Sequence, residues 1–340
     1  MKKWKIFGVV FLVINLFIGY RFYSKIYNPV VIDPNGKYLY IATGSSFQDV
    51  VSGLKESNFI TDDTSFEKLA DIKKYKNNVK PGRYRIDKGM SNNDLVNLLR
   101  SGVQEEVNIT FNNSRTKEKA AGLICRNLEA DSAIFLNLLK DSDLCKANGF
   151  TTENIGTLLI PNTYKFYWNT NAEQVYNRML REFKVFWNEN RLQKAKNIGL
   201  SPQEVSVLAS IVISETSKKK DAPIIAGVYL NRLKRGIPFQ ADPTLVFAKG
   251  DFSIRRVLDE DKEVDSPYNT YKYPGIPPGP IYISPASYLD HVLNYKKHDY
   301  IFFCAKEDFS GYSNFAKTNA EHNRNARKYR RALNKRGIKR

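Results

Sequence analysis

The pattern of apolar and polar positions begins with a stretch that predicts one membrane-spanning helix. Residues 6–20 are uncharged and almost entirely apolar, with a lysine cluster at residues 2–5 before them and Arg21 after them. A bilayer core usually requires about 20 apolar residues. Trp4 and Tyr20 can lie at the two interfaces, which extends the effective length of the run. Residues 1–24 are therefore expected to form a short stub and an anchor.

The same segment predicts the compartment of the rest of the chain. Residues 21–29 are bulky and aromatic, whereas cleavage of a signal peptide requires small residues, so an uncleaved anchor is favoured over a removed signal. Lysines ahead of the run place the amino terminus in the cytoplasm. We therefore expect a single-pass protein of the cell (inner) membrane, with residues 25–340 on the outer (periplasmic) side.

Residues 36–105 alternate short strand-like runs with amphipathic helices, which predicts a small α+β module. The predicted elements are strands at 38–42 and 83–86 and helices at 45–57 and 91–100, the latter ending before Gly102. The polar segment 71–78 is expected to be solvated surface. A strand at 107–111 and a mostly helical region at 115–195, broken by a loop or strand at 159–166, follow.

The helix that is predicted to begin at Ser201 carries the first candidate catalytic residue. Ser201 and Glu204 form a capping-box pattern, and helical spacing places Glu215 on the same face as Leu208 and Val212. An apolar environment favours the neutral carboxyl group, which is what a general acid needs near neutral pH. The alternative is an ordinary ion pair between Glu215 and the lysines at 218–220.

A polar, proline-rich region follows. A helix at 226–233, ended by Gly236, precedes a segment in which Gln240, Asp242 and Thr244 alternate as on an extended chain. Prolines and glycines next to amide, hydroxyl and aromatic groups continue to residue 287. This composition is typical of a rigid polar groove.

The distribution of charge and the spacing of cysteines and histidines limit the classes of ligand and partner that we expect. Half of the net charge of +18 lies in the last 24 residues, so a basic tail at 324–340 could bind nucleic acid, anionic lipid or an acidic wall polymer, and the alternative is a solvated helical tail. Nucleic acid is disfavoured as a partner because the tail is expected outside the cell. The three cysteines and three histidines show no metal-ligand spacing, so neither a metal, nor a cofactor, nor a disulfide framework is expected.

Five ordered blocks resemble the MltG/YceG-like endolytic murein transglycosylases: 210–216 (SIVISET), 226–233 (AGVYLNRL), 240–244 (QADPT), 266–271 (SPYNTY) and 275–281 (GIPPGPI). Residues 159–164 and 316–323 resemble further elements of this family, the second being its closing Glu-His-Asn motif. Two positions depart from the family pattern. Residues 111–114 read FNNS where Pro-Glu-Gly is usual, and Ser313 stands where a histidine is common.

The resemblance implies an α+β fold with a transmembrane helix, a LysM-like module at 36–105 and a YceG-like catalytic domain at 106–323. It implies peptidoglycan as substrate, cleavage of the β-1,4 bond between N-acetylmuramic acid and N-acetylglucosamine, and 1,6-anhydro ends that terminate glycan elongation. Glu215 would be the catalytic acid. The expected substrate-binding residues are Asn231, Arg232, Gln240, Asp242, Thr244, Tyr268, Asn269 and Tyr271.

Other functions stay open at this point. If Asp242 faces Glu215 with room for a water molecule, the chain would be a peptidoglycan hydrolase; otherwise Asp242 would only cap the turn before Pro243. A non-catalytic, wall-binding membrane scaffold that tethers cell-wall synthases is the alternative from another class. A nucleic-acid binder is supported only by the basic tail.

Overall fold

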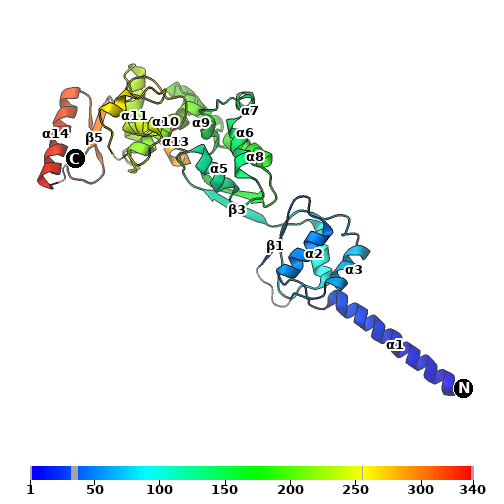
Figure 1. Ribbon diagram of the computed structural model, residues 1–340. Helices are drawn as coiled ribbons and strands as arrows, with labels where there is room; N and C mark the ends of the chain where they lie inside the picture. Colours follow the sequence, from blue (N-terminus) through cyan, green and yellow to red (C-terminus); the bar gives the residue numbers. More distant parts are fainter. Residues whose placement is uncertain (1, 32–36, 255, 338–340) are drawn as a thin grey trace. The chain divides into compact units, whose positions relative to one another are not determined.

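The computed structural model describes residues 2–31, 37–254 and 256–337, and it shows a mixed α+β protein that is mostly helical (Figure 1). The chain divides into two compact units. Unit 1 comprises residues 1–109 with 127–130 and 164–171, and unit 2 comprises 110–126, 131–163 and 172–340. Residue 36, the expected start of the module, and residues 338–340, the end of the basic tail, lie outside the described residues.

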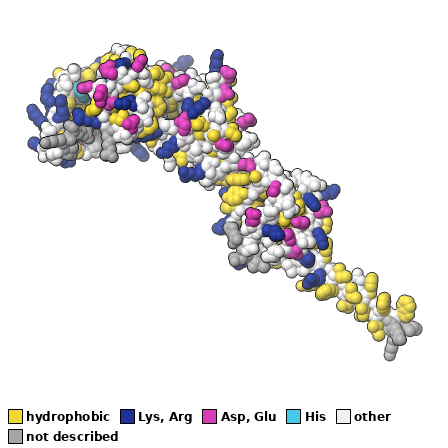
Figure 2. Space-filling view, in the orientation of Figure 1, with side chains coloured by type: hydrophobic (Ala, Val, Ile, Leu, Met, Phe, Trp, Pro, Cys, Tyr) yellow, Lys and Arg dark blue, Asp and Glu magenta, His cyan; other side chains and the backbone are white. Residues whose placement is uncertain are grey.

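Helix α1 (Lys2–Tyr27) is the helix expected at the amino terminus. Its stretch Trp4–Tyr27 has 24 residues, contains an 18-residue window with a mean hydropathy of 1.9 and has no residue buried in the protein, and Figure 2 shows apolar side chains along it. The helix continues past Arg21, so at 1.5 Å per residue this stretch is about 36 Å long. It is long and apolar enough to cross a bilayer core of about 30 Å.

Unit 1 contains the helices α2 (Phe47–Glu56), α3 (Asp63–Ile72) and α4 (Asn92–Ser101). Its two strands, β1 (Tyr38–Ile41) and β2 (Gly82–Arg85), pair antiparallel, and α2 and α3 lie between them in the sequence. Ser46 and Ser91 begin α2 and α4 with complete capping boxes, and Gly102 ends α4 in the left-handed conformation. The strands and the helices α2 and α4 predicted here are confirmed. The prediction that 71–78 is only solvated surface is wrong, because the Tyr75 ring is fully buried.

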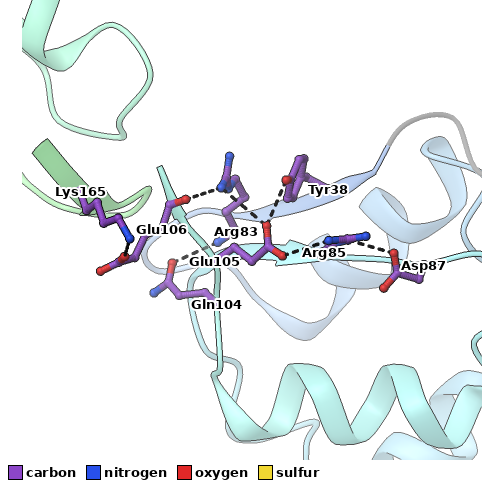
Figure 3. A network of polar contacts seen from close by, with 8 residues as sticks. All are labelled: Tyr38, Arg83, Arg85, Asp87, Gln104, Glu105, Glu106 and Lys165. Atoms are coloured by element: carbon purple, nitrogen blue, oxygen red, sulfur yellow. Dashed lines mark hydrogen bonds and ion pairs between the residues drawn. The ribbon is translucent and has the colours of Figure 1, made fainter. Parts of the chain in front are cut away.

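A polar network surrounds Arg83 in unit 1 (Figure 3). Its guanidinium donates to the backbone carbonyl of Glu106 at 2.6 Å and lies 4.2 Å from the Tyr38 ring centre. The Tyr38 hydroxyl donates to Glu105, which also pairs with Arg85 at 3.7 Å. These contacts join β1 and β2 to Glu105 and to the first residue of strand β3 (Glu106–Phe111).

Strands β3 (Glu106–Phe111) and β4 (Asn162–Tyr167) pair in a second sheet, and each passes from one unit to the other. The elements of unit 2 that precede the site are α5 (Lys117–Cys125), α6 (Ser132–Lys140), α7 (Ser142–Ala147), the 3-10 helix η1 (Ile155–Leu158), α8 (Ala172–Phe186) and α9 (Glu189–Ile198). The predictions of a strand near 107–111 and a mostly helical region after it are confirmed.

The core of unit 2 forms around helix α10 (Pro202–Glu215). Ser201 caps α10 with the predicted capping box, and every residue from Val205 to Val212 is buried. A helix that is buried on all sides is typical of the centre of a domain. Helices α11 (Ala222–Lys234) and α13 (Ala286–Leu293) pack against it.

The remaining elements are α12 (Asp242–Lys249), the 3-10 helix η2 (Glu260–Glu263), the antiparallel strands β5 (Phe302–Ala305) and β6 (Ser313–Ala316), and α14 (Asn319–Lys335). The extended segment expected through Thr244 is wrong beyond residue 242, because Pro243 lies at the start of a helix, a position that proline favours. Helix α14 runs through residue 324, where the tail was expected to begin, and it packs on β5 and β6.

Candidate active site

A cleft of about 660 Å³ lies in unit 2 at the carboxyl end of α10. Side chains from α10, α11, α12, β5 and α14 and from the loops next to them surround it. The lining residues are Glu215, Tyr229, Arg232, Phe239, Gln240, Asp242, Tyr271, Phe302, Phe303, Asn319, His322 and Asn323. The cleft therefore combines two carboxyl groups with amides and aromatic rings.

Glu215 is the last residue of α10, and the chain turns to an extended conformation at Thr216. Part of its side chain is accessible from the cleft, while protein atoms surround it on its other sides. Oε1 accepts a hydrogen bond of 3.0 Å from the Tyr229 hydroxyl on α11. In the part of the chain that the structure describes, no lysine pairs with Glu215, so the ion pair considered as an alternative is not formed.

Burial raises the pKa of Glu215 to about 7, and the nearby negative charge of Asp242 adds to this rise. The Tyr229 hydrogen bond and the positive charge of Arg232 act against the increase in this pKa. Desolvation dominates because a carboxylate loses water hydration when it is enclosed by protein. Glu215 can consequently hold its proton at neutral pH, as a general acid must.

Asp242 and Tyr271 form a second polar pair in the cleft. The Tyr271 hydroxyl donates a hydrogen bond to Oδ1 of Asp242. Asp242 is the first residue of α12, and its carboxyl group does not cap that helix. Burial and the Asp242 hydrogen bond raise the pKa of Tyr271, so this hydroxyl stays protonated at neutral pH.

Arg232 lines the cleft but directs its guanidinium into the protein. It donates to the carbonyls of Ile301 at 2.7 Å, Pro238 at 3.0 Å and Phe239 at 2.8 Å, and the residue is only 7% exposed. A longer contact of 3.4 Å reaches the Gln240 side chain. Arg232 therefore supports the walls of the cleft through Nε and Nη1, which donate to these carbonyls.

Gln240 lines the cleft with a backbone φ of +53°, which is uncommon for a residue with a side chain. Its N–H donates to the Thr270 carbonyl at 3.0 Å, which helps to hold this conformation. Residues in such conformations occur often at functional sites, where surrounding contacts compensate their strain.

The structure does not bring the other four expected substrate-binding residues into the cleft lining. The Asn231 amide donates to the carbonyls of His298 and Tyr300. Thr244 and Asn269 are fully buried, and their side chains hydrogen-bond within the protein. Tyr268 packs on the Phe247 ring, with centroids 4.8 Å apart. The polar groups of Asn231, Thr244 and Asn269 thus have partners within the protein, while Tyr268 contributes ring packing.

Several lining residues were not among the predicted site residues. Tyr229 was hidden inside an apolar helical pattern, and Phe302 and Phe303 belong to a strand that was not predicted. His322 comes from the first turns of α14, and its ring stacks on Phe302 with centroids 5.2 Å apart. The resemblance to a closing Glu-His-Asn motif was the available signal for His322. Burial lowers the pKa of this histidine, which favours the neutral ring.

Ser313, which departs from the family pattern, lies at the start of β6. Its N–H donates to Oδ2 of Asp221 at 2.7 Å, and it does not line the cleft.

Comparison with known proteins identifies the family of this chain. The YceG-like family matches residues 39–328. An endolytic murein transglycosylase of Bacillus subtilis is 32% identical over 85% of this chain and 83% of its own length. One from Streptococcus pneumoniae is 26% identical over 96% of this chain, which spans 65% of that relative. The crystal structure of a yceG-like protein from Listeria monocytogenes superimposes with a TM-score of 0.54, at 27% identity over 84% of this chain and 97% of that one. The chain belongs to the YceG-like family.

Proposed function

We propose that this chain is an endolytic murein transglycosylase that cuts peptidoglycan strands with Glu215 as its catalytic acid. The observation that carries the proposal is a carboxyl group with a pKa of about 7 in an open cleft, oriented by the Tyr229 hydroxyl. The relatives from Bacillus subtilis and Streptococcus pneumoniae are named for this activity, which supports the same function here.

In the proposed reaction, protonated Glu215 gives its proton to the oxygen that bridges N-acetylmuramic acid and N-acetylglucosamine. The C1–O bond breaks, and the N-acetylglucosamine side leaves as an alcohol. Ionised Glu215 then removes the proton of the muramyl 6-hydroxyl while that oxygen bonds to C1, which gives the 1,6-anhydro product. One carboxyl group serves both steps, because the nucleophile belongs to the sugar that is being cut.

The rest of the cleft suits a sugar chain. Gln240, Asp242 and Tyr271 offer hydrogen-bonding groups, and the aromatic rings of Phe239 and Phe302 provide apolar surface for sugar faces. Among the eight expected substrate-binding residues, we retain Gln240, Asp242 and Tyr271 for direct contact. Arg232 acts through the loop carbonyls that it holds.

The membrane arrangement belongs to the same proposal. Helix α1 serves as a single-pass anchor, the preceding lysines keep the amino terminus in the cytoplasm, and residues 25–340 lie on the outer side. Residues 36–105 act as a LysM-like module that binds the wall. The anchor would keep the enzyme next to newly made strands, where cell-wall synthases work and where cutting terminates elongation.

The test uses the full-length chain in detergent with uncrosslinked glycan strands and mass spectrometry of the products. Internal cuts that leave 1,6-anhydro-muramic ends are expected, and Glu215→Gln should abolish cutting while strands still bind. Retained binding without cutting by the wild-type protein would support a scaffold instead. An active Glu215→Gln protein would refute the assigned acid.

One observation favours a second candidate, a hydrolase. Asp242 lines the same cleft as Glu215, and its charge contributes to the raised pKa of Glu215. A second carboxylate could activate water, as in inverting glycosidases. Hydrolysis would leave reducing muramic ends, so the same mass spectra separate the two reactions.

A further inference from the structure

A second cavity of about 660 Å³ lies beside the catalytic cleft. Asp242 lines both cavities. The second cavity is also lined by Ile213, Ser214 and Ser217, which are the close neighbours of Glu215 along the chain. The two cavities therefore adjoin at Asp242, near the end of α10 that carries Glu215.

The lining of the second cavity differs from that of the catalytic cleft. It is largely aliphatic and aromatic, including Pro243, Val246, Phe247, Phe252, Ile254 and Val257. Arg115 is the one lysine or arginine among its described lining residues. The Arg115 guanidinium lies over the Phe252 ring, 5.0 Å from its centre, while the side chain stays exposed. This cation–π contact orients Arg115 and leaves its N–H donors available for a ligand.

The two cavities differ in how their arginines are held. In the catalytic cleft, Arg232 is only 7% exposed and donates through Nε and Nη1 to backbone carbonyls, whereas Arg115 in the second cavity is exposed. His322 is held neutral by burial. Asp242 places the same negative charge in both cavities, so the exposed Arg115 guanidinium is what attracts a carboxylate on the sugar toward the second cavity.

We propose that the second cavity binds the carboxylate-bearing stem peptide of the N-acetylmuramic unit at the bond that is cut, with Arg115 pairing to a peptide carboxylate. The proposal rests on peptidoglycan being the substrate. Methyl and methylene groups of a short peptide suit the apolar wall, and a guanidinium binds a carboxylate with two parallel hydrogen bonds. Arg115 is then a specificity-determining residue that distinguishes peptide-bearing strands from bare ones.

The experiment measures binding separately from cutting. Fluorescently labelled, uncrosslinked glycan strands are prepared with their stem peptides, and a matched portion is stripped of peptides by an amidase. Fluorescence anisotropy gives the Kd of each for the full-length Glu215→Gln protein in detergent. The same measurement is made with Arg115→Ala, Arg115→Lys or Arg126→Ala added. Arg126 is an exposed arginine of unit 2 that lines neither cavity, so it is the matched control.

The Glu215→Gln protein should bind peptide-bearing strands about tenfold more tightly than bare strands, as expected for one charge-assisted pair. Arg115→Ala should remove this preference and leave the affinity for bare strands unchanged. Arg115→Lys should keep part of it, because lysine retains the charge but not the paired hydrogen bonds. Arg126→Ala should keep the full preference.

Equal binding of both strand types by the Glu215→Gln protein would overturn the proposal. An equal loss for both strand types in Arg115→Ala would also overturn it, because Arg115 would then support the protein rather than read the peptide. Failure of the proposed function would be detected in a different measurement, because mass spectrometry would then find no cut products from the wild-type protein. The preference for peptide-bearing strands is measured without any cutting.

Discussion

The hydroxyl of Tyr229 donates a hydrogen bond of 3.0 Å to Oε1 of Glu215, across 14 positions of sequence and two packed helices. This bond orients the carboxyl group and lowers its pKa against the larger effect of burial. Tyr229→Phe removes the bond and keeps the ring. We expect kcat to fall about tenfold, within the range for a group that positions a general acid, and the pKa of Glu215 to rise.

The pH–rate profile of Tyr229→Phe checks this prediction, because a merely structural role would lower the rate without moving the profile. Tyr273→Phe is the matched control. Its hydroxyl donates to Asp265 at 2.6 Å on the exposed surface, away from the cleft lining. If both variants keep the wild-type profile, the proposed role of Tyr229 is wrong.

The pH dependence of the wild-type enzyme follows from the acid assignment. Glu215 must be protonated for the first step, and its pKa is raised by burial to about 7. We expect kcat/KM to be constant well below pH 7 and to fall about tenfold for each pH unit above it. Initial rates on soluble glycan strands between pH 5 and pH 9 measure this. A rate that rises through pH 8 would be incompatible with Glu215 acting as the acid.

The raised pKa of Glu215 also predicts how stability changes with pH. The folded protein keeps this proton up to a pH of about 7, while the unfolded chain releases it near the ordinary value of 4.5. Between these values the folded state binds more protons, so the free energy of unfolding decreases as pH rises. The Glu215→Gln side chain has no proton to release, so the variant avoids this decrease in the free energy of unfolding. The decrease amounts to at most about 3 kcal/mol.

Thermal unfolding of the wild-type and Glu215→Gln proteins at pH 4 and pH 8 tests the linkage. The Tm of the variant relative to wild type should be clearly higher at pH 8 than at pH 4. A Tm difference that is the same at both pH values would show that the Glu215 pKa is not raised.

Arg232 should contribute to stability more than to substrate binding. Arg232→Ala leaves buried carbonyls of Pro238, Phe239 and Ile301 without their donor, and we expect a loss of about 3 kcal/mol or more in the free energy of unfolding. Arg235→Ala replaces the next arginine in the chain, which is exposed. Its free energy of unfolding should stay within about 0.5 kcal/mol of the wild-type value. Denaturant titrations compare the two. A small effect of Arg232→Ala would mean that water replaces its hydrogen bonds.

Asp242→Asn separates the two candidate reactions. Removal of the negative charge should lower the pKa of Glu215, so the alkaline fall in rate should begin at a lower pH. In a transglycosylase the anhydro ends persist, and the rate changes moderately because Asp242 neither gives nor takes a proton. Loss of essentially all cutting, with reducing ends in the wild-type products, would favour the hydrolase.

Local sequence patterns predicted many of the elements. Ser201, Glu204 and Pro202 begin α10 through contacts within one helical turn, and Gly102 ends α4 by adopting a conformation that glycine tolerates. These signals act over three or four residues, so they can be read without knowing the fold. Residues 242–244 were mispredicted because the alternation of polar residues suggested an extended segment, while Pro243 favoured the helix α12.

The composition of the cleft depended on contacts between distant parts of the chain. Arg232 was predicted to bind substrate, yet its guanidinium donates to the Ile301 carbonyl, 69 positions away. His322 joins Glu215 in the cleft only because α14 packs on β5. The catalytic role of Glu215 itself stays a prediction that the experiments above decide.

The uncharged apolar run identified the amino-terminal helix, and capping and periodicity identified α10 and the position of Glu215 on it, because these signals act between neighbours in the chain. Which polar groups remain free for a substrate was decided by tertiary packing. Burial sets the pKa of Glu215, and long-range hydrogen bonds occupy Arg232, Asn231 and Asn269. Desolvation and partner choice are properties of the folded surroundings, and no local pattern encodes them.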